Sequence, residues 1–405
     1  MAAQPDTVDS GTSAAVWRLG KHLPHLDGVR GMAILIVTLY RFSKELPTNT
    51  EIGRFLKTAF AFGDRGVDLF FVLSGFLITG ILFDAKGKAG YFKNFFARRS
   101  LRIFPLYFFA LFLFLVVVGW FGPYREMFAQ AKTNQFFLWT YLVNVKMSLE
   151  DAWCFGYLDH FWSLAVEEHF YLVWPLVIFF CSRRVALLVA FGLALLSAGS
   201  RIVFAMVAEN GVAPDVLTLF RCDALLLGSC LALLIRGSNG LQPLLKWSYI
   251  VFPACLLIGV GCGISGRRVF TISHTLWPLI WCCVLIWLLN GQRHQAIARL
   301  FNLSILRRLG KYSYAMYVFQ SPLIPLTAGA LSVPHLARFV GNEVLANLAY
   351  ILIMSLLTYG AALLSWHLLE KHCLKLKKWF EHSPPASSYS ASAGNVLSAK
   401  KVTEA

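Results

Sequence analysis

Charged residues are scarce in this sequence. Only 14% of its 405 residues are Asp, Glu, Lys or Arg, whereas 57% are hydrophobic. Soluble domains carry about 25% charged residues, so this composition excludes an ordinary soluble domain. The mean hydropathy of +0.61 supports the same conclusion. We therefore expect a polytopic integral membrane protein.

Three other features are missing. The first 20 residues contain no basic segment followed by an apolar run, so no cleavable signal peptide is expected. The nine cysteines lie mostly in apolar segments without metal-ligand spacing, so we expect neither a metal site nor a disulfide framework. No internal repeat is strong enough to indicate the inverted symmetry of many transporters.

Apolar segments long enough to cross a bilayer recur along the chain. They predict an all-α protein of about ten transmembrane helices. The expected spans are 27–46, 64–83, 104–121, 163–181, 185–207, 221–236, 248–265, 270–290, 312–331 and 345–369. They form one expected membrane domain over 22–380, between a flexible cytoplasmic N-terminus at 1–21 and a disordered cytoplasmic tail at 381–405.

Positive charge alternates along the expected spans. The segment 84–103 is rich in lysine and arginine, whereas 208–220 and 332–344 have almost none. The positive-inside rule then puts both termini in the cytoplasm. Much of the net charge of +16 follows from this topology, so no nucleic-acid partner is expected.

Two arginines interrupt the first apolar segment, residues 22 to 46. Arginine at a helix centre costs about 2.5–3.5 kcal/mol on insertion scales and therefore indicates a functional site. Arg30 and Arg41 are eleven residues apart, which at about 100° per residue puts both on one helical face. At about 1.5 Å per residue they stand about 16 Å apart. We expect a polar cavity among the helices; the alternative is that both side chains snorkel to opposite interfaces.

The segment 64–82 carries Asp64, Arg65 and Asp68 near one end and Ser74-Gly75 in its middle. Small residues in mid-span are typical of helix packing, so a structural role is favoured over a catalytic one for Ser74. Asp68 is expected to pair with an arginine such as Arg41.

Two further arginines, Arg99 and Arg102, open the next span. They are three residues apart and share a helical face. Two forked guanidiniums at the cytosolic edge suit a phosphate-rich ligand. A plain anchor on anionic lipid explains them equally well.

The segment 159–175 concentrates polar residues at the expected outer mouth of a span. Glu167 is a candidate acid/base, or a structural partner of Arg41 or Arg221. His160 and His169 are nine residues apart and lie on different faces, which disfavours a two-histidine metal site. Arg221 and Asp223 are expected to form a local salt bridge. The connection 122–162 is rich in aromatic residues. We interpret these residues as an interface belt in preference to a platform for stacking glycans.

Six segments, in this order, resemble the acyltransferase-3 family of membrane O-acyltransferases over residues 22–380. They are LDGVRGMAILIVTLY, GVDLFFVLSGFLIT, ARRSLRIFPLY, HFWSLAVEEHFYLVWP, RCDALLLG and GKYSYAMYVFQSPL. The resemblance implies transfer of an acyl group, usually acetyl, from cytosolic acyl-CoA to a hydroxyl of an extracytoplasmic polysaccharide or glycolipid. It implies acyl-CoA (expected to be acetyl-CoA) as donor substrate, no permanently bound cofactor, contact with membrane lipid and a bacterial inner-membrane location. Members often carry a fused esterase-like domain, whereas here only the membrane unit is expected.

The family's motifs suggest site residues, with two departures. Arg30 matches the basic residue of the first motif, but Arg41 stands where the family has histidine, and Gln320 replaces another histidine. Because arginine cannot act as a base, Arg41 is expected to stabilise an oxyanion, and Glu167, His160 and His169 are the candidate bases. The expected catalytic residues are Glu167, Arg41 and Arg30; Arg99 and Arg102 would hold the CoA phosphates; and Asp68, His160, Trp162, Glu168 and Arg221 would bind the acceptor.

The departures leave two alternatives. The chain could be a catalytically impaired relative serving as an accessory or scaffold in glycan modification. It could also be a lipid or glycan transporter that uses the same polar cavity.

Overall fold

The computed structural model describes residues 23–207, 211–265, 273–290 and 295–380. Every regular element in these ranges is helical, which confirms the all-α prediction. The segments expected to be a flexible N-terminus and a disordered tail lie outside the described residues.

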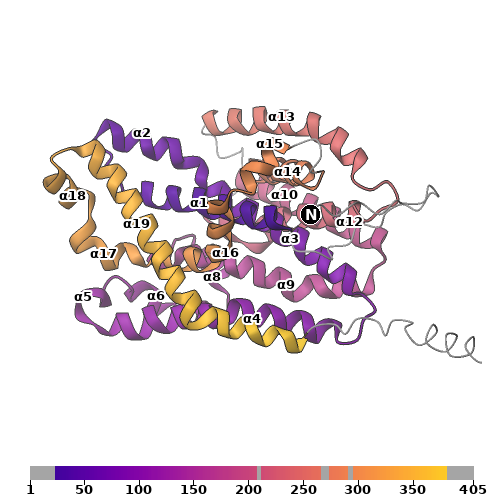
Figure 1. Cartoon of the computed structure of the whole chain (residues 1–405), viewed down its shortest axis with the longest axis horizontal. Coiled ribbons are helices and arrows are strands. Elements are labelled where there is room, and N and C mark those ends of the chain that lie inside the picture. The colour runs from indigo at the N-terminus through magenta and orange to yellow at the C-terminus, as the bar shows by residue number, and fades with distance from the viewer. Residues whose placement is uncertain (1–22, 208–210, 266–272, 291–294, 381–405) are drawn as a thin grey trace, which may run out of the picture.

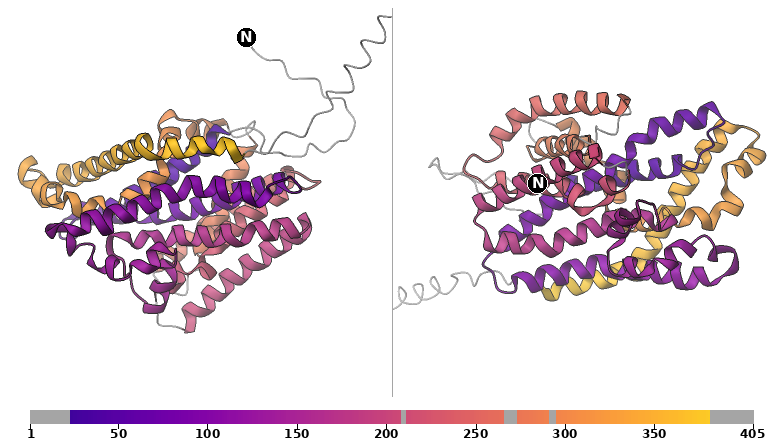
Figure 2. Two further views of the ribbon diagram at one scale, coloured as in Figure 1. Left: turned by 90° about the horizontal axis from the view of Figure 1, so that it is seen from below. Right: turned by 180° about the vertical axis from the view of Figure 1, so that it is seen from behind.

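The long helices run mostly along the longest axis of the molecule (Figures 1 and 2). They are α1 (Pro24–Ser43), α3 (Arg65–Ala85), α4 (Tyr91–Leu111), α9 (Trp162–Phe180), α10 (Arg183–Val207), α12 (Thr218–Leu234), α13 (Gln242–Ser265), α14 (Ser273–Leu289), α16 (Ser304–Phe319) and α19 (Glu343–Ser365). Shorter helices connect them: α2 (Glu51–Phe60), α5 (Gly122–Arg125), α6 (Ala129–Thr133), α7 (Gln135–Trp139), α8 (Val143–Glu150), α11 (Ala213–Val216), α15 (Gln295–Phe301), α17 (Leu323–Leu331), α18 (Val333–Val340) and α20 (Lys371–Lys375).

Eight helical stretches of the described chain are long and apolar enough to cross a membrane. The architecture is therefore that of a polytopic membrane protein, although the count of ten is not confirmed. α1 is not among the eight, because it carries Asp27, Arg30 and Arg41. α16 has only 16 residues, and α14 is represented by a shorter apolar stretch.

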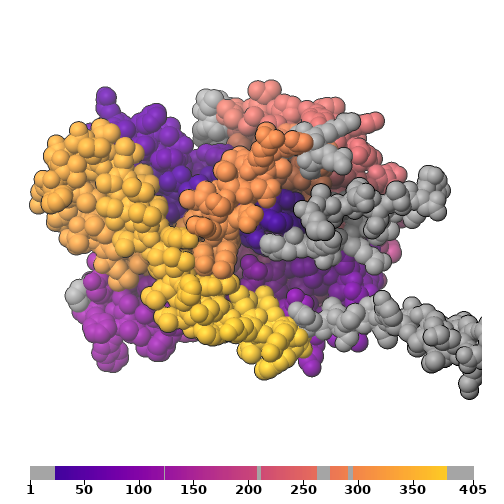
Figure 3. All heavy atoms as spheres, in the orientation of Figure 1, coloured from indigo at the N-terminus to yellow at the C-terminus, as the bar shows by residue number. Residues whose placement is uncertain are grey.

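Several connections and their cations meet at one end of the molecule, which we call the basic end. Lys86 after α3 donates to the Cys181 carbonyl after α9 at 2.6 Å. Arg236 after α12 pairs with Asp84 at 2.8 Å. The C-terminal part of the chain crosses the face shown in Figure 3 and reaches the same end, whereas α2, α5, α17 and α18 lie at the far end (Figures 1 and 3).

Two glycines permit a close crossing of α3 and α12. A Cβ on Gly75 of α3 would lie 1.8 Å from the Leu225 carbonyl oxygen of α12. A Cβ on Gly228 of α12 would lie 2.0 Å from the Val72 carbonyl oxygen of α3. The expected packing role is therefore seen at Gly75, as is typical of small residues between membrane helices.

The ion pairs in this region differ from those expected. Asp223 does not pair with Arg221; it accepts from Arg201 of α10 at 2.9 Å, and both side chains are buried. Arg221 instead pairs with Asp68 of α3 at 2.5 Å. Neighbours in sequence point to different sides of α12, so their partners come from different helices.

Replacing Asp223 by Asn should destabilise the fold by about 3–5 kcal/mol, because Arg201 would keep a buried and unpaired charge. The measurement is thermal or denaturant unfolding of the purified protein in detergent. As a control, Lys146→Met removes the exposed pair between Lys146 and Glu150 and should cost less than about 1 kcal/mol. Equal losses for the two variants would contradict this assignment.

Candidate functional site

Three cavities lie in series through the bundle. The basic cavity, at the basic end, has a volume of about 540 Å³. The central cavity measures about 100 Å³ and the wide cavity, toward the far end, about 860 Å³. The basic and central cavities share Arg30, Arg99 and Arg102. The central and wide cavities share Val67 and Tyr317.

Cations dominate the polar lining of the basic cavity. α1 supplies Arg30, and α4 supplies Arg98, Arg99 and Arg102, which lie within little more than one helical turn. Lys377, after α20, also lines this cavity. Asp27 pairs with Arg30 at 3.1 Å and partly offsets the charge. The cavity has the charge and forked donors to hold a phosphate-bearing ligand.

The sequence contains no local signal for the place of Lys377. It belongs to a run of lysines that follows the last expected span, and such a run by itself indicates only a cytoplasmic flank. Its side chain reaches the basic cavity because the helical turns after α19 run along α4 (Figure 1).

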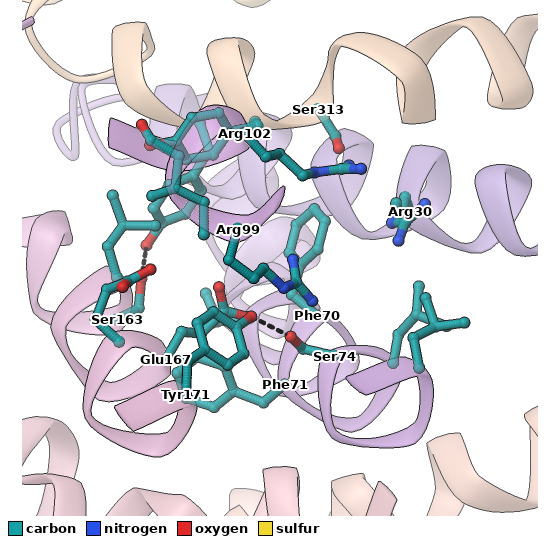
Figure 4. Close-up of a pocket in the computed structure, with 18 residues that line it drawn as sticks. Arg30, Phe70, Phe71, Ser74, Arg99, Arg102, Ser163, Glu167, Tyr171 and Ser313 are labelled. Atoms are coloured by element: carbon teal, nitrogen blue, oxygen red, sulfur yellow. Dashed lines mark hydrogen bonds between the residues drawn. The ribbon is translucent and has the colours of Figure 1, made fainter. Parts of the chain in front are cut away.

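The central cavity brings together polar groups from three helices. Glu167 and Tyr171 come from α9, Ser74 from α3 and Arg99 from α4 (Figure 4). The Ser74 and Tyr171 hydroxyls form a short hydrogen bond, and the Glu167 carboxylate lies beside both of them. The Arg99 guanidinium stacks 4.6 Å from the centre of the Tyr171 ring. A carboxylate, two hydroxyls and a cation thus converge in a small cavity.

Ser74 departs from its expected role in helix packing. Its neighbour Gly75 makes the contact with α12, and Ser74 itself lines the central cavity. Successive residues of a helix lie about 100° apart, so one can pack on a neighbouring helix while the next faces a cavity. Which of the two faces the cavity depends on the rotation of α3, which the sequence does not specify.

A hydroxyl pair separates the central and wide cavities. The Ser163 and Tyr317 hydroxyls are 2.6 Å apart, and Tyr317 also donates to the His160 carbonyl at 2.9 Å. Tyr317 of α16 lines both cavities. Movement of this one side chain would change the opening between them.

The wide cavity contains several of the expected site residues. Arg41, His160, Trp162, Arg221 and Gln320 line it. The Arg221 guanidinium lies 5.6 Å from the centre of the Trp162 ring. Arg41 is 3.7 Å from Glu45, and Gln320 accepts from Thr38 at 3.5 Å. Arg41 and Gln320, the two positions where the motif resemblance leads us to expect histidine, therefore face one cavity.

The remaining expected residues are distributed differently. Glu168 lines the central cavity. His169 lies outside the linings of the three cavities and bonds to Thr218 at 2.7 Å. The suggested pair of Asp68 with Arg41 is wrong: Asp68 contacts Arg221 at 2.5 Å and Arg65 at 3.8 Å. Asp68 also lies outside the three linings, because it faces α12.

His274 of α14, which no motif in the sequence singles out, lies on the wall of the wide cavity. Its Nδ1 accepts from Arg65 at 2.8 Å and from Arg221. Its Nε2 lies 3.1 Å from the Asp215 carboxylate. This arrangement fixes the neutral tautomer with its proton on Nε2. Asp215 and His274 are too far apart in sequence to belong to one motif.

Fold and site together define a polytopic membrane protein in which cationic and acidic groups line successive cavities between its two ends. The chain belongs to the acyltransferase-3 family: the family model described as an acyltransferase domain matches residues 23–367. This confirms the resemblance found in the sequence.

Curated relatives agree with this assignment. YrhL of Bacillus subtilis is 30% identical over 385 residues, which cover 87% of this chain and 55% of YrhL. The peptidoglycan O-acetyltransferase OatA of Listeria monocytogenes is 28% identical over 334 residues, 77% of this chain and 51% of OatA. The O-acetyltransferase OatA of Staphylococcus aureus is 27% identical over 337 residues, 75% of this chain and 51% of that protein. The chain thus spans about half the length of these relatives, and no solved structure matches it.

Proposed function

We propose that this chain is a membrane O-acyltransferase that moves an acetyl group from cytosolic acetyl-CoA to a hydroxyl of an extracytoplasmic polysaccharide or glycolipid. The observation that supports this proposal most strongly is the series of three cavities. The cavity at the basic end is cationic, and the central cavity contains Glu167. The Listeria monocytogenes relative is a peptidoglycan O-acetyltransferase and the Staphylococcus aureus relative is an O-acetyltransferase. These names support a cell-envelope glycan as acceptor.

Charge orients the proposed reaction in the membrane. The basic end carries Lys86 and Arg236 and the cations of the basic cavity. By the positive-inside rule such an end would face the cytoplasm, as would both termini. Acetyl-CoA would then enter the basic cavity with its phosphates on Arg99, Arg102 and Lys377. Its thioester would reach the central cavity, where Arg30 lines the passage.

The glycan would bind in the wide cavity. Trp162, Trp153 and Tyr157 provide aromatic surfaces there, and Arg221, His160 and Arg41 provide polar contacts. Glu167 would take the proton of the attacking hydroxyl, and Arg41 would stabilise developing negative charge at the acceptor side.

Arg102→Ala should raise the KM for acetyl-CoA about tenfold to a hundredfold and change kcat less, because a charged hydrogen bond to a phosphate contributes about 1.5–3 kcal/mol. The measurement is release of free CoA thiol at varied acetyl-CoA. Arg54→Ala, at an exposed position of α2, is the matched control and should leave KM unchanged. A loss confined to kcat would assign Arg102 a different role.

Ester-linked acetyl on cell-surface glycan, measured with and without this chain, tests the function itself. Deletion should remove the acetyl groups, and the wild-type gene should restore them. The Arg41→His variant is measured in parallel with the wild type. It should not raise acetylation, because the natural chain is proposed to be active. A sharp rise would support the second candidate, an impaired relative with an accessory role, which Arg41 and Gln320 favour. Movement of glycan or lipid without any acyl donor would instead support a transporter.

A further inference from the structure

Ser74 lies in a setting that activates a serine for attack. Its Oγ bonds to the Tyr171 hydroxyl, and the Glu167 carboxylate lies beside that pair. A nucleophile within reach of a base, with a third group to orient them, is the arrangement that covalent catalysis requires. Gly75 fixes this stretch of α3 by its contact with Leu225.

The other two serines of the central cavity are engaged differently. Ser163 donates to the His160 carbonyl at 3.2 Å and contacts Tyr317. Ser313 donates to the Gly310 carbonyl at 2.9 Å. The Ser313 hydroxyl satisfies a main-chain oxygen of its own helix, and the Ser163 hydroxyl is shared between a carbonyl of the preceding turn and Tyr317. The Ser74 hydroxyl instead pairs with the Tyr171 hydroxyl, next to the Glu167 carboxylate.

The central cavity is too small to hold the acyl donor and the acceptor together. Its volume of about 100 Å³ accommodates only a few water molecules, which is room for a short acyl group. CoA would occupy the basic cavity and the glycan the wide cavity, and Tyr317 with Ser163 stands between the central and wide cavities. A direct attack would bring both large substrates to one small space at once.

We propose that Ser74 carries the acyl group between the two substrates as a covalent acyl-enzyme. This inference rests on the proposed function. In the first half-reaction the Ser74 oxygen bonds to the thioester carbonyl carbon and the carbon–sulfur bond breaks. The hydroxyl proton passes to Glu167 and then to the departing CoA thiolate, which leaves as free CoA.

The second half-reaction transfers the group to the glycan. The acceptor hydroxyl gives its proton to Glu167 and bonds to the same carbonyl carbon. The ester bond to Ser74 breaks, and the serine oxygen recovers the proton from Glu167. No oxidant, metal or further reactant is needed, and the enzyme returns to its starting state. The small cavity restricts the carried group to acetyl or a similarly short acyl chain.

Isotope exchange without acceptor tests the intermediate. The purified full chain in detergent is mixed with acetyl-CoA and labelled CoA, with no glycan present. An acyl-enzyme predicts exchange of label between CoA and acetyl-CoA by the wild type, and an acetyl mass increment on the peptide that contains Ser74. Ser74→Ala should lose both, and its acetyl transfer to glycan should fall at least about a thousandfold.

Two further variants keep the test decisive. Ser74→Cys should form a thioester that neutral hydroxylamine cleaves, which identifies the attachment atom even if Ser74→Ala folds poorly. Ser355→Ala removes a hydroxyl of α19 that bonds to the Ile351 carbonyl at 2.6 Å, outside the three cavities, and should exchange at the wild-type rate.

The outcomes separate the two proposals. A wild-type chain that acetylates glycan but shows no exchange, or a Ser74→Ala variant that transfers acetyl at the wild-type rate, overturns the serine intermediate alone. A wild-type chain that transfers no acetyl from acetyl-CoA to any glycan overturns the proposed function and this inference with it.

Discussion

Glu167→Gln should lower kcat for acetyl transfer about a hundredfold to ten-thousandfold, the range typical of a lost general base. The amide keeps the size of the carboxylate and can still accept a hydrogen bond from Ser74 or Tyr171, but it cannot take a proton. Because the CoA phosphates are proposed to bind in the basic cavity, away from this residue, the KM for acetyl-CoA should change little. Steady-state release of CoA thiol with an acceptor glycan measures both constants.

This experiment also decides between the two interpretations of Glu167. The alternative is a structural partner for an arginine, such as Arg99, which lines the same central cavity. A structural role predicts that Glu167→Gln lowers the unfolding temperature together with activity, whereas a base predicts a stable but inactive protein. Glu51→Gln, at an exposed position of α2, is the control and should change neither quantity. Full activity of Glu167→Gln would exclude it as the base.

Gly228→Ala should destabilise the protein by about 1–3 kcal/mol or more, the usual cost of overpacking a tight contact. The added Cβ would lie 2.0 Å from the Val72 carbonyl oxygen, and a main-chain oxygen cannot move without shifting α3. Since α3 also carries Ser74, the shift would disturb the central cavity. The measurement is thermal unfolding together with size-exclusion chromatography in detergent.

Gly360→Ala is the matched control for this prediction. Gly360 lies in α19, and an added Cβ there meets nothing within 4 Å. Alanine is better than glycine in a helix by about 0.8–1 kcal/mol, so the unfolding temperature should stay constant or rise. If both alanine variants behaved alike, the close crossing of α3 and α12 would not be a determinant of stability.

The departures from the family concentrate on one side of the molecule. Arg41 and Gln320, the two positions where the motif resemblance leads us to expect histidine, both line the wide cavity. That cavity still contains two imidazoles, His160 and His274, although His274 is held between guanidiniums and the Asp215 carboxylate. The central and basic cavities keep their motif residues, including Glu167, Arg99 and Arg102. The chain therefore differs most on the proposed acceptor side.

The sequence by itself determined the class of fold and the family. Hydropathy and the scarcity of charge predict membrane helices because a bilayer excludes unpaired polar groups whatever the tertiary arrangement. The order of six motifs indicated the acyltransferase-3 family. Arg30 and Glu167 could be selected because an ionisable residue within an apolar segment is visible in the sequence alone.

Only the tertiary structure decided which polar groups meet. The partner of Asp68 is Arg221, 153 residues away, and Ser74 faces a cavity while Gly75 packs on α12. Both facts depend on how each helix is rotated about its axis and how it crosses its neighbours. A different rotation would change the contacts completely, although the residue pattern of the helix would stay the same. Lys377 likewise reaches the basic cavity through the path of the C-terminal segment. Local sequence encodes which residues enter the membrane, whereas packing between distant helices sets which of them share a site.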